Sequence, residues 1–262
     1  MKSILLALLS FFFAFNVFSE EDLSTKPVEK LIDDLAEIDA QAPGLHGTAS
    51  VQGFIAEDKP FKFGGGVLGS QAPKVSPPMR ELARRGVTVL PDLIKHLSDK
   101  RPTKLKMGKK FFMFRLFLNE YDPKDPKNYH TSSDQGKSFF ETGKQFEGDY
   151  TIKIGDVCYA IIGQIVNREL CTVRYQPSAG LIINSPIETP ELAEAVKKDW
   201  GNVDKDSFRE FLLKEVKSHT GTDQDTVLVR LRFYFPDDYE KLKQGGFKKA
   251  VESFEEHEKR ER

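Results

Sequence analysis

The feature that most constrains this chain is an apolar stretch near its middle, residues 155–168, with the sequence GDVCYAIIGQIVNR. Hydrophobic residues lie on nearly every side of it, and Gln164 and Asn167 supply the polar side chains of its interior. A helix that is apolar all round belongs in a protein core. Asp156 is a residue type suited to cap its start, and apolar residues recur at i, i+4 and i+8. We therefore predict a buried central helix, although a buried strand is the competing interpretation.

Amphipathic patterns predict further helices on both sides of this stretch. Two of them are joined by a tight turn at Gly86, with Ser76 and Thr88 placed as their caps, and should form an antiparallel hairpin. The segment 226–235 alternates like a strand and also fits a helix, and we interpret it as helix. The other expected helices cover 27–40, 189–200, 204–221, 237–244 and 246–262.

Residues 103–154 are least like the rest of this helical pattern. The sequence KKFFMFRLFLNEY at 109–121 is too aromatic to lie free in water, and residues 150–154 alternate like a short strand. We expect a small antiparallel β-element packed on the helices. The stretch 45–75 shows no sustained period and is expected to form a long ordered loop.

The segment 81–102, ELARRGVTVLPDLIKHLSDKRP, resembles a HEAT-type repeat, and 155–168 resembles the first helix of a following repeat. The long insertion between the two pieces departs from the family. This resemblance implies helix pairs that stack on one another to share a core. The expected fold is mainly α, an irregular HEAT-like helical stack with a small antiparallel β-insertion at about 103–154 and long ordered loops. A single domain over 20–262 is expected.

The start of the chain has the form of a signal peptide covering 1–19. Lys2 precedes an apolar run at 4–17, which is short for a membrane span and is followed by a plausible cleavage site. An uncleaved N-terminal anchor is the alternative. The chain also resembles exported bacterial proteins of no assigned activity. We expect export to the periplasm or outside the cell, with no transmembrane span in the mature chain.

The two cysteines, Cys158 and Cys171, leave two interpretations open. In an oxidising compartment they are able to form a disulfide, which would add about 3 kcal/mol in the chain-entropy model. Alternatively each is a small buried hydrophobic residue, because Cys158 lies in the middle of the predicted helix and disulfide geometry is strict.

Charge and motifs exclude several classes of function. With 39 Lys and Arg against 40 Asp and Glu, the chain has no basic excess to bind nucleic acid. Residues 64–69 satisfy G-x-G-x-x-G, but the strand before and the helix after that a phosphate cradle requires are missing. The five histidines lie far apart, so no metal-ligand spacing is present. We expect no cofactor and no metal.

The best candidate binding segment follows the central helix, in a turn-rich stretch that we expect at the surface. It combines a fixed charge, an aromatic ring and amides, residue types that often form a binding surface. The loop around His46 is a second candidate that is able to fold against it. The structural alternative is that these side chains make local hydrogen bonds and an ion pair. The candidate ligand-binding residues are His46, Arg174, Tyr175, Gln176, Asn184 and Ser185.

Two hypotheses for function follow. The first is an exported, non-catalytic binding or scaffold protein of the cell envelope, with another envelope protein as its partner. It rests on the repeat-like helices and on the lack of a catalytic motif. The second is a hydrolase or carbohydrate-active enzyme whose site is built from the loops of His46 and of 174–185. The first is favoured.

Overall fold

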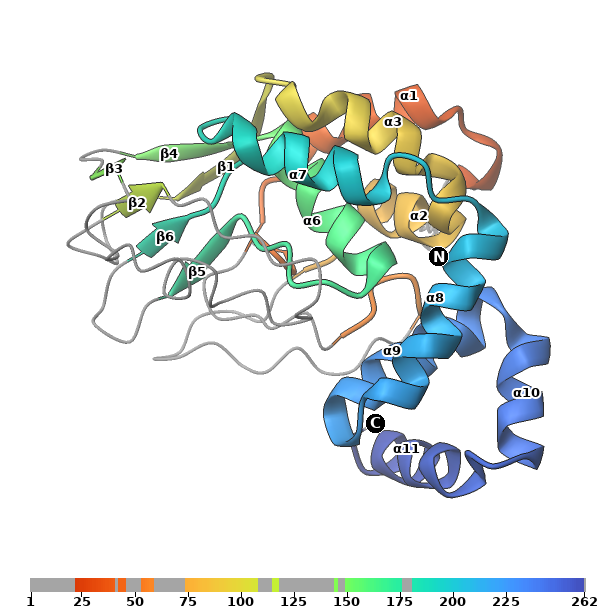
Figure 1. Ribbon diagram of the computed structural model, residues 1–262. Helices are drawn as coiled ribbons and strands as arrows, with labels where there is room; N and C mark the ends of the chain where they lie inside the picture. Colours follow the sequence, from red (N-terminus) through yellow and green to blue (C-terminus); the bar gives the residue numbers. More distant parts are fainter. Residues whose placement is uncertain are drawn as a thin grey trace, which may run out of the picture.

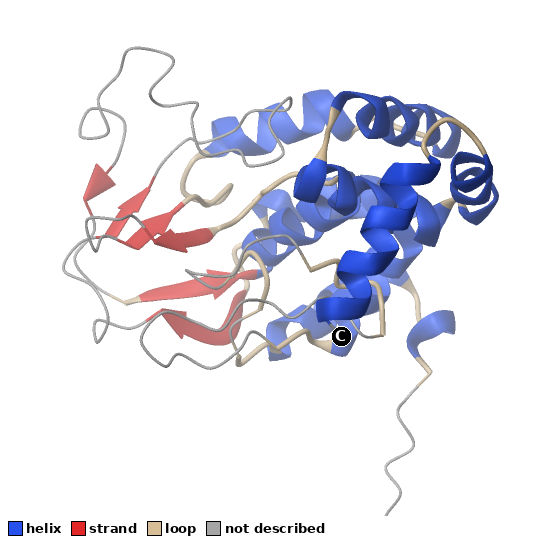
Figure 2. Ribbon diagram, turned by 90° about the horizontal axis from the view of Figure 1, so that it is seen from below, coloured by secondary structure: helices blue, strands red, loops and turns tan. Residues whose placement is uncertain are grey.

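The computed structural model describes most of the chain and shows a mainly helical protein with its strands gathered at one end (Figures 1 and 2). The described residues are 22–40, 42–45, 53–58, 74–107, 115–117, 144–145, 149–175 and 181–261. The predicted signal peptide and His46 lie outside them. No helix in the described part is long and apolar enough to cross a membrane.

The central helix, α6, covers Ile154–Val166, and every one of its residues is buried. This confirms the predicted core helix and excludes the strand interpretation. Helices α2 (Pro77–Arg85) and α3 (Leu90–Lys95) both pack on α6. The helix begins two residues before Asp156, so the prediction that Asp156 is its N-cap is wrong. Asp156 lies in the first turn and accepts a hydrogen bond from the backbone N–H of Lys153, the true N-cap, at 2.9 Å.

The first helices of the chain surround α6 (Figure 1). The predicted helix 27–40 is α1 (Val28–Asp34), which continues as the 3-10 turn η2 (Leu35–Glu37) and is preceded by η1 (Leu23–Thr25). Ser76 caps α2 as expected, by accepting from the backbone N–H of Met79 at 3.4 Å. Thr88 does not cap α3. It lies in the 3-10 turn η4 (Gly86–Val89) and donates back to the carbonyl of Arg85 at 2.8 Å.

Two small sheets contain the described strands. β1 (Pro102–Met107) pairs antiparallel with β4 (Tyr150–Lys153), which confirms the small antiparallel element predicted within 103–154. The second sheet has the order β3-β2-β6-β5, and its β2–β6 pair is parallel. Its strands are β2 (Arg115–Phe117), β3 (Lys144–Gln145), β5 (Val173–Tyr175) and β6 (Leu181–Ile183). The sheet therefore joins the insertion to the candidate binding segment, which the sequence did not indicate.

The rest of the chain is helical, and its last helices lie away from the strands (Figure 1). The ambiguous segment 226–235 is helix, as predicted, in α9. Gly221 was expected to stop the preceding helix, but it is the first residue of α9, with a φ of 63°. The helices are η5 (His96–Ser98), α7 (Pro190–Trp200), α8 (Lys205–Ser218), α9 (Gly221–Tyr234), α10 (Pro236–Gln244) and α11 (Lys248–Glu261).

Close packing around α6 predicts that Gly163→Ala destabilises the protein. A methyl group at Gly163 would lie 2.6 Å from the backbone oxygen of Arg168 and 2.8 Å from Cβ of Leu170. Overpacking of this kind costs about 1–3 kcal/mol in the free energy of unfolding. Urea denaturation measures it. Gly246→Ala is the control, because nothing lies within 4 Å of its added methyl, and a change within about 0.5 kcal/mol is expected. Equal stability of the two variants would contradict the packing described.

Candidate functional site

The structure places the predicted binding residues in three different settings. Asn184 and Ser185 follow β6 and are buried, with 2% and 0% of their surface exposed. Arg174 and Tyr175 belong to β5, next to β6 in the sheet. His46 and Gln176 lie outside the described residues. The expectation that this segment lies at the surface is therefore wrong for Asn184 and Ser185.

Asn184 and Ser185 are buried because their side chains bond to the first half of α6. The Ser185 hydroxyl donates to Asp156 Oδ1 at 2.5 Å, and it accepts the backbone N–H of Ile187 at 3.1 Å. The Asn184 amide donates to the hydroxyl of Tyr159 at 3.4 Å. These contacts correspond to the structural alternative for this segment, which is local hydrogen bonding rather than the contact of a ligand.

A buried ring of three oxygen-bearing side chains forms around Asp156. The Tyr150 hydroxyl lies 2.8 Å from Asp156 Oδ2 and 3.0 Å from the Ser185 oxygen, and Ser185 closes the ring to Asp156. Each of the three oxygen–oxygen contacts needs one proton to be a hydrogen bond. An ionised Asp156 leaves two protons for three contacts, whereas a protonated Asp156 supplies the third. All three contacts are therefore hydrogen bonds only when Asp156 is protonated.

The electrostatic environment of Asp156 agrees with this count. Burial raises the pKa of the Asp156 carboxyl to about 6, and the hydrogen bonds from Ser185, Lys153 and Tyr150 oppose the rise without cancelling it. The same burial raises the pKa of the Tyr150 hydroxyl, so Tyr150 stays a donor. The ring joins β4, α6 and the segment after β6, and it is shielded from solvent. We interpret it as structural.

A second buried polar group lies at the other end of α6. Arg230 of α9 is fully buried; its Nε donates to the carbonyl of Gln164 at 2.7 Å and its Nη1 to the carbonyl of Thr226 at 2.7 Å. The guanidinium lies 4.8 Å from the ring centre of Phe54. The Gln164 side chain in turn accepts the backbone N–H of Ile55 at 3.1 Å. This group ties α9 and the segment 53–58 to the end of α6.

The two cysteines are not bridged in the structure. Cys158 and Cys171 are free, and both are buried. Burial raises the pKa of the Cys158 thiol, which keeps it protonated and unreactive. Among the described residues, no group of three or more His, Cys, Asp or Glu side chains is placed to hold a metal ion.

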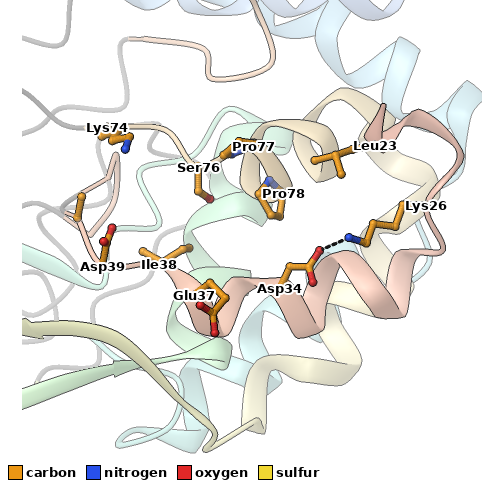
Figure 3. Close-up of a pocket in the computed structure, with 11 residues that line it drawn as sticks. Leu23, Lys26, Asp34, Glu37, Ile38, Asp39, Lys74, Ser76, Pro77 and Pro78 are labelled. Carbon is orange, nitrogen blue, oxygen red and sulfur yellow. Dashed lines mark ion pairs between the residues drawn. The ribbon is translucent and has the colours of Figure 1, made fainter. Parts of the chain in front are cut away.

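A pocket of about 440 Å³ lies between α1–η2 and the start of α2 (Figure 3), and is here called the α1–α2 pocket. Leu23, Ile38, Pro77 and Pro78 supply apolar surface to it. Small-molecule sites commonly have this volume and a mainly apolar lining with a few polar groups. The charged residues that line the pocket are Lys26, Asp34, Glu37, Asp39 and Lys74.

Some of the charged residues that line the α1–α2 pocket form ion pairs, and others do not. Lys26 pairs with Asp34 at 2.8 Å at one end of it (Figure 3). Glu37 pairs with Lys104. Asp39 and Lys74 lie toward the other end, and both are exposed. Neither makes a hydrogen bond or an ion pair with another described residue, although the charge of Asp39 also acts on Lys104. The pocket therefore offers one carboxylate and one ammonium group to a ligand. Sequence reasoning missed it, because nothing near 39 or 74 forms a motif.

Comparison with family models, with curated proteins and with solved structures yields no match to this chain.

The ring around Asp156 predicts a specific pH dependence. Because the pKa of Asp156 is higher in the folded than in the unfolded chain, the native state binds the extra proton. The contribution of Asp156 to the free energy of unfolding should therefore fall as pH rises from about 4 to 7. In Asp156→Asn the amide donates to Ser185 and accepts from Tyr150 at every pH. The stability of Asp156→Asn minus that of the wild type should rise over this range, by up to about 3 kcal/mol.

Urea denaturation of both proteins at a series of pH values measures that difference, and the other titrating groups cancel in it. Ser185→Ala is the second variant. It opens the ring and should destabilise the protein at all pH values. A difference between the wild type and Asp156→Asn that stays constant from pH 4 to 7 would contradict the proton count.

Proposed function

We propose that this protein is an exported, non-catalytic binding protein of the cell envelope, and that the α1–α2 pocket holds a small zwitterionic ligand of the amino-acid or short-peptide class. The observation that carries the proposal is the presence of two opposite charges, Asp39 and Lys74, neither in an ion pair with a described residue, beside a largely apolar cavity of about 440 Å³. A ligand ammonium group would bind Asp39 and its carboxylate would bind Lys74. Export rests on the sequence of residues 1–19.

The chemistry of the lining residues supports binding rather than catalysis. Ser76 is the only hydroxyl among the described lining residues, and its oxygen is already used as the cap of α2. None of these lining residues is a histidine or a cysteine, so no nucleophile and base stand together here. The hydrolase hypothesis gains no support from Asn184 and Ser185, because both side chains bond inside the core.

We also propose that the helices form an irregular HEAT-like stack. Supporting this, α2 and α3 are joined by the turn at Gly86, and both pack on α6, the helix that resembles the start of a following repeat. Against a regular repeat, α2 and α3 contact α6 more than each other. The stack supports the pocket, because α1 packs on both α2 and α6 and holds the wall that bears Asp39.

The proposed function predicts that Asp39→Asn and Lys74→Gln each weaken ligand binding. L-leucine and the dipeptide Leu-Leu are suitable probes, because they carry both charges and an apolar side chain, and isothermal titration calorimetry measures their affinity. Loss of one charged contact should weaken binding at least tenfold, about 1.4 kcal/mol. Both side chains are exposed and neither forms an ion pair with a described residue, so the folding stability should change by no more than about 0.5 kcal/mol.

Asp237→Asn and Lys249→Gln are matched controls, since both residues are exposed and lie outside the pocket. They should bind the probes as the wild type does. The proposal would be rejected if the wild type bound neither probe, or if the two pocket variants bound as tightly as the controls.

A further inference from the structure

A second pocket lies beside the first and has an unused arginine. It has a volume of about 280 Å³ and is formed by η1, the first turns of α2 and residue 58. Leu23 and Pro77 line both pockets, so the two cavities are neighbours on either side of these side chains. Its polar lining consists of Asp22, Ser24, Asp58, Arg80, Glu81 and Arg84. We call it the Arg80 pocket.

Most of the charges in the Arg80 pocket are already paired. Arg84 pairs with Asp58, and its Nε also donates to the carbonyl of Ala56 at 2.9 Å. Glu81 accepts a hydrogen bond from Arg85 at 2.9 Å. These partners leave neither Arg84 nor Glu81 available for a new ionic contact.

Arg80 is different, because its guanidinium makes no hydrogen bond or ion pair with any described residue. Its Nε is also shielded from solvent and has no acceptor. A buried donor without a partner is unfavourable, and more so when the group is charged. Because Nε is shielded, an anion in the pocket would bind the terminal nitrogens of the Arg80 guanidinium.

Among the described residues that line the pocket, Asp22 is the carboxylate that lacks an ion pair. Hydrogen bonds from the side chain of Ser24 and from its backbone N–H, the latter at 3.0 Å, lower the pKa of Asp22 and keep it ionised. Asp22 is exposed, so water and salt screen its charge. Arg80 is only partly exposed, so its charge is less screened. Arg80 is therefore the group that determines which charge the pocket accepts.

We propose that the Arg80 pocket binds an anionic group, a carboxylate or a phosphate. The planar guanidinium offers parallel N–H donors whose spacing fits the two oxygens of either group. The inference goes beyond the proposed function, because it concerns another cavity and does not require a ligand in the α1–α2 pocket.

Titration with two anions tests this inference. Inorganic phosphate and acetate are added separately to the full chain at constant ionic strength, and binding is followed by backbone amide NMR shifts in α2. We expect saturable binding to the wild type and at least tenfold weaker binding to Arg80→Gln. Arg80→Lys keeps the charge without the planar fork and should lie between them. Tighter binding of phosphate would assign the pocket to a phosphate group, and tighter binding of acetate to a carboxylate.

Arg260→Gln is the matched control, because Arg260 is exposed on α11 and does not line this pocket. It should bind both anions as the wild type does. Arg80 has no internal partner, so Arg80→Gln should melt within a degree or two of the wild type. The absence of saturable binding to the wild type, or equal binding by Arg80→Gln, would overturn the inference. Asp39→Asn should bind phosphate normally, which separates this test from that of the α1–α2 pocket.

Discussion

The fold depends on the complete burial of α6. A helix that is apolar on all sides gains about 25 cal/mol for each Å² of apolar surface removed from water, but only if neighbours cover the whole of it. Here α1, α2 and α3 supply part of that cover, and the segment 53–58 and α9 close its last turns. A helix buried in this way has no water at its ends. Its terminal polar groups must therefore find partners inside the protein.

The polar groups at the two ends of α6 have different partners, a carboxyl group at the start and a guanidinium at the end. At the start, the Asp156 carboxyl accepts the N–H of Lys153 and is held by Tyr150 and Ser185. At the finish, Asn167 adopts a left-handed conformation, so Arg168 N–H bonds to Gly163 and the carbonyl of Gln164 is left open. The guanidinium of Arg230 donates a hydrogen bond to this carbonyl. A cation is favourable there because the C-terminal end of a helix carries partial negative charge.

This arrangement buries the positive charge of Arg230, which is unfavourable unless the charge is compensated. Burial lowers the pKa of its guanidinium to about 10, which still leaves it charged at neutral pH. Two backbone carbonyls and the face of Phe54 compensate the charge, and the carboxylate of Glu57 also acts on it without forming an ion pair. Nη2 of Arg230 and Nε2 of Gln164 have no protein partner, which is a pattern that an internal water commonly completes. Because its guanidinium is fully buried and bonds to backbone carbonyls, we assign Arg230 a structural role.

The sequence indicated the helices well because their signals are local. The apolar period of 155–168 and the cap at Ser76 depend on residues a few positions apart, and both predictions are confirmed. The position of Ser185 depends on Asp156, which lies 29 residues away in the chain. The sequence around a polar residue in a turn-rich stretch looks the same whether its side chain bonds to a buried carboxyl group or to water. That is why Asn184 and Ser185 were predicted at the surface.

The α1–α2 pocket and the Arg80 pocket were missed for the same reason. What distinguishes them is charged side chains that form no ion pair, and the sequence does not show which charges are paired. Asp39, Lys74 and Arg80 are ordinary surface residue types in sequence, and near them lie other acids and bases with which they are able to pair. The structure shows that those neighbours are used elsewhere: Glu37 by Lys104 and Glu81 by Arg85. Charged side chains that form no ion pair beside a cavity indicate a binding site only when the backbone that bears them is fixed. Here α1 and α2 pack on the buried α6, so the core that needs complete cover also holds the pocket walls in place before any ligand arrives.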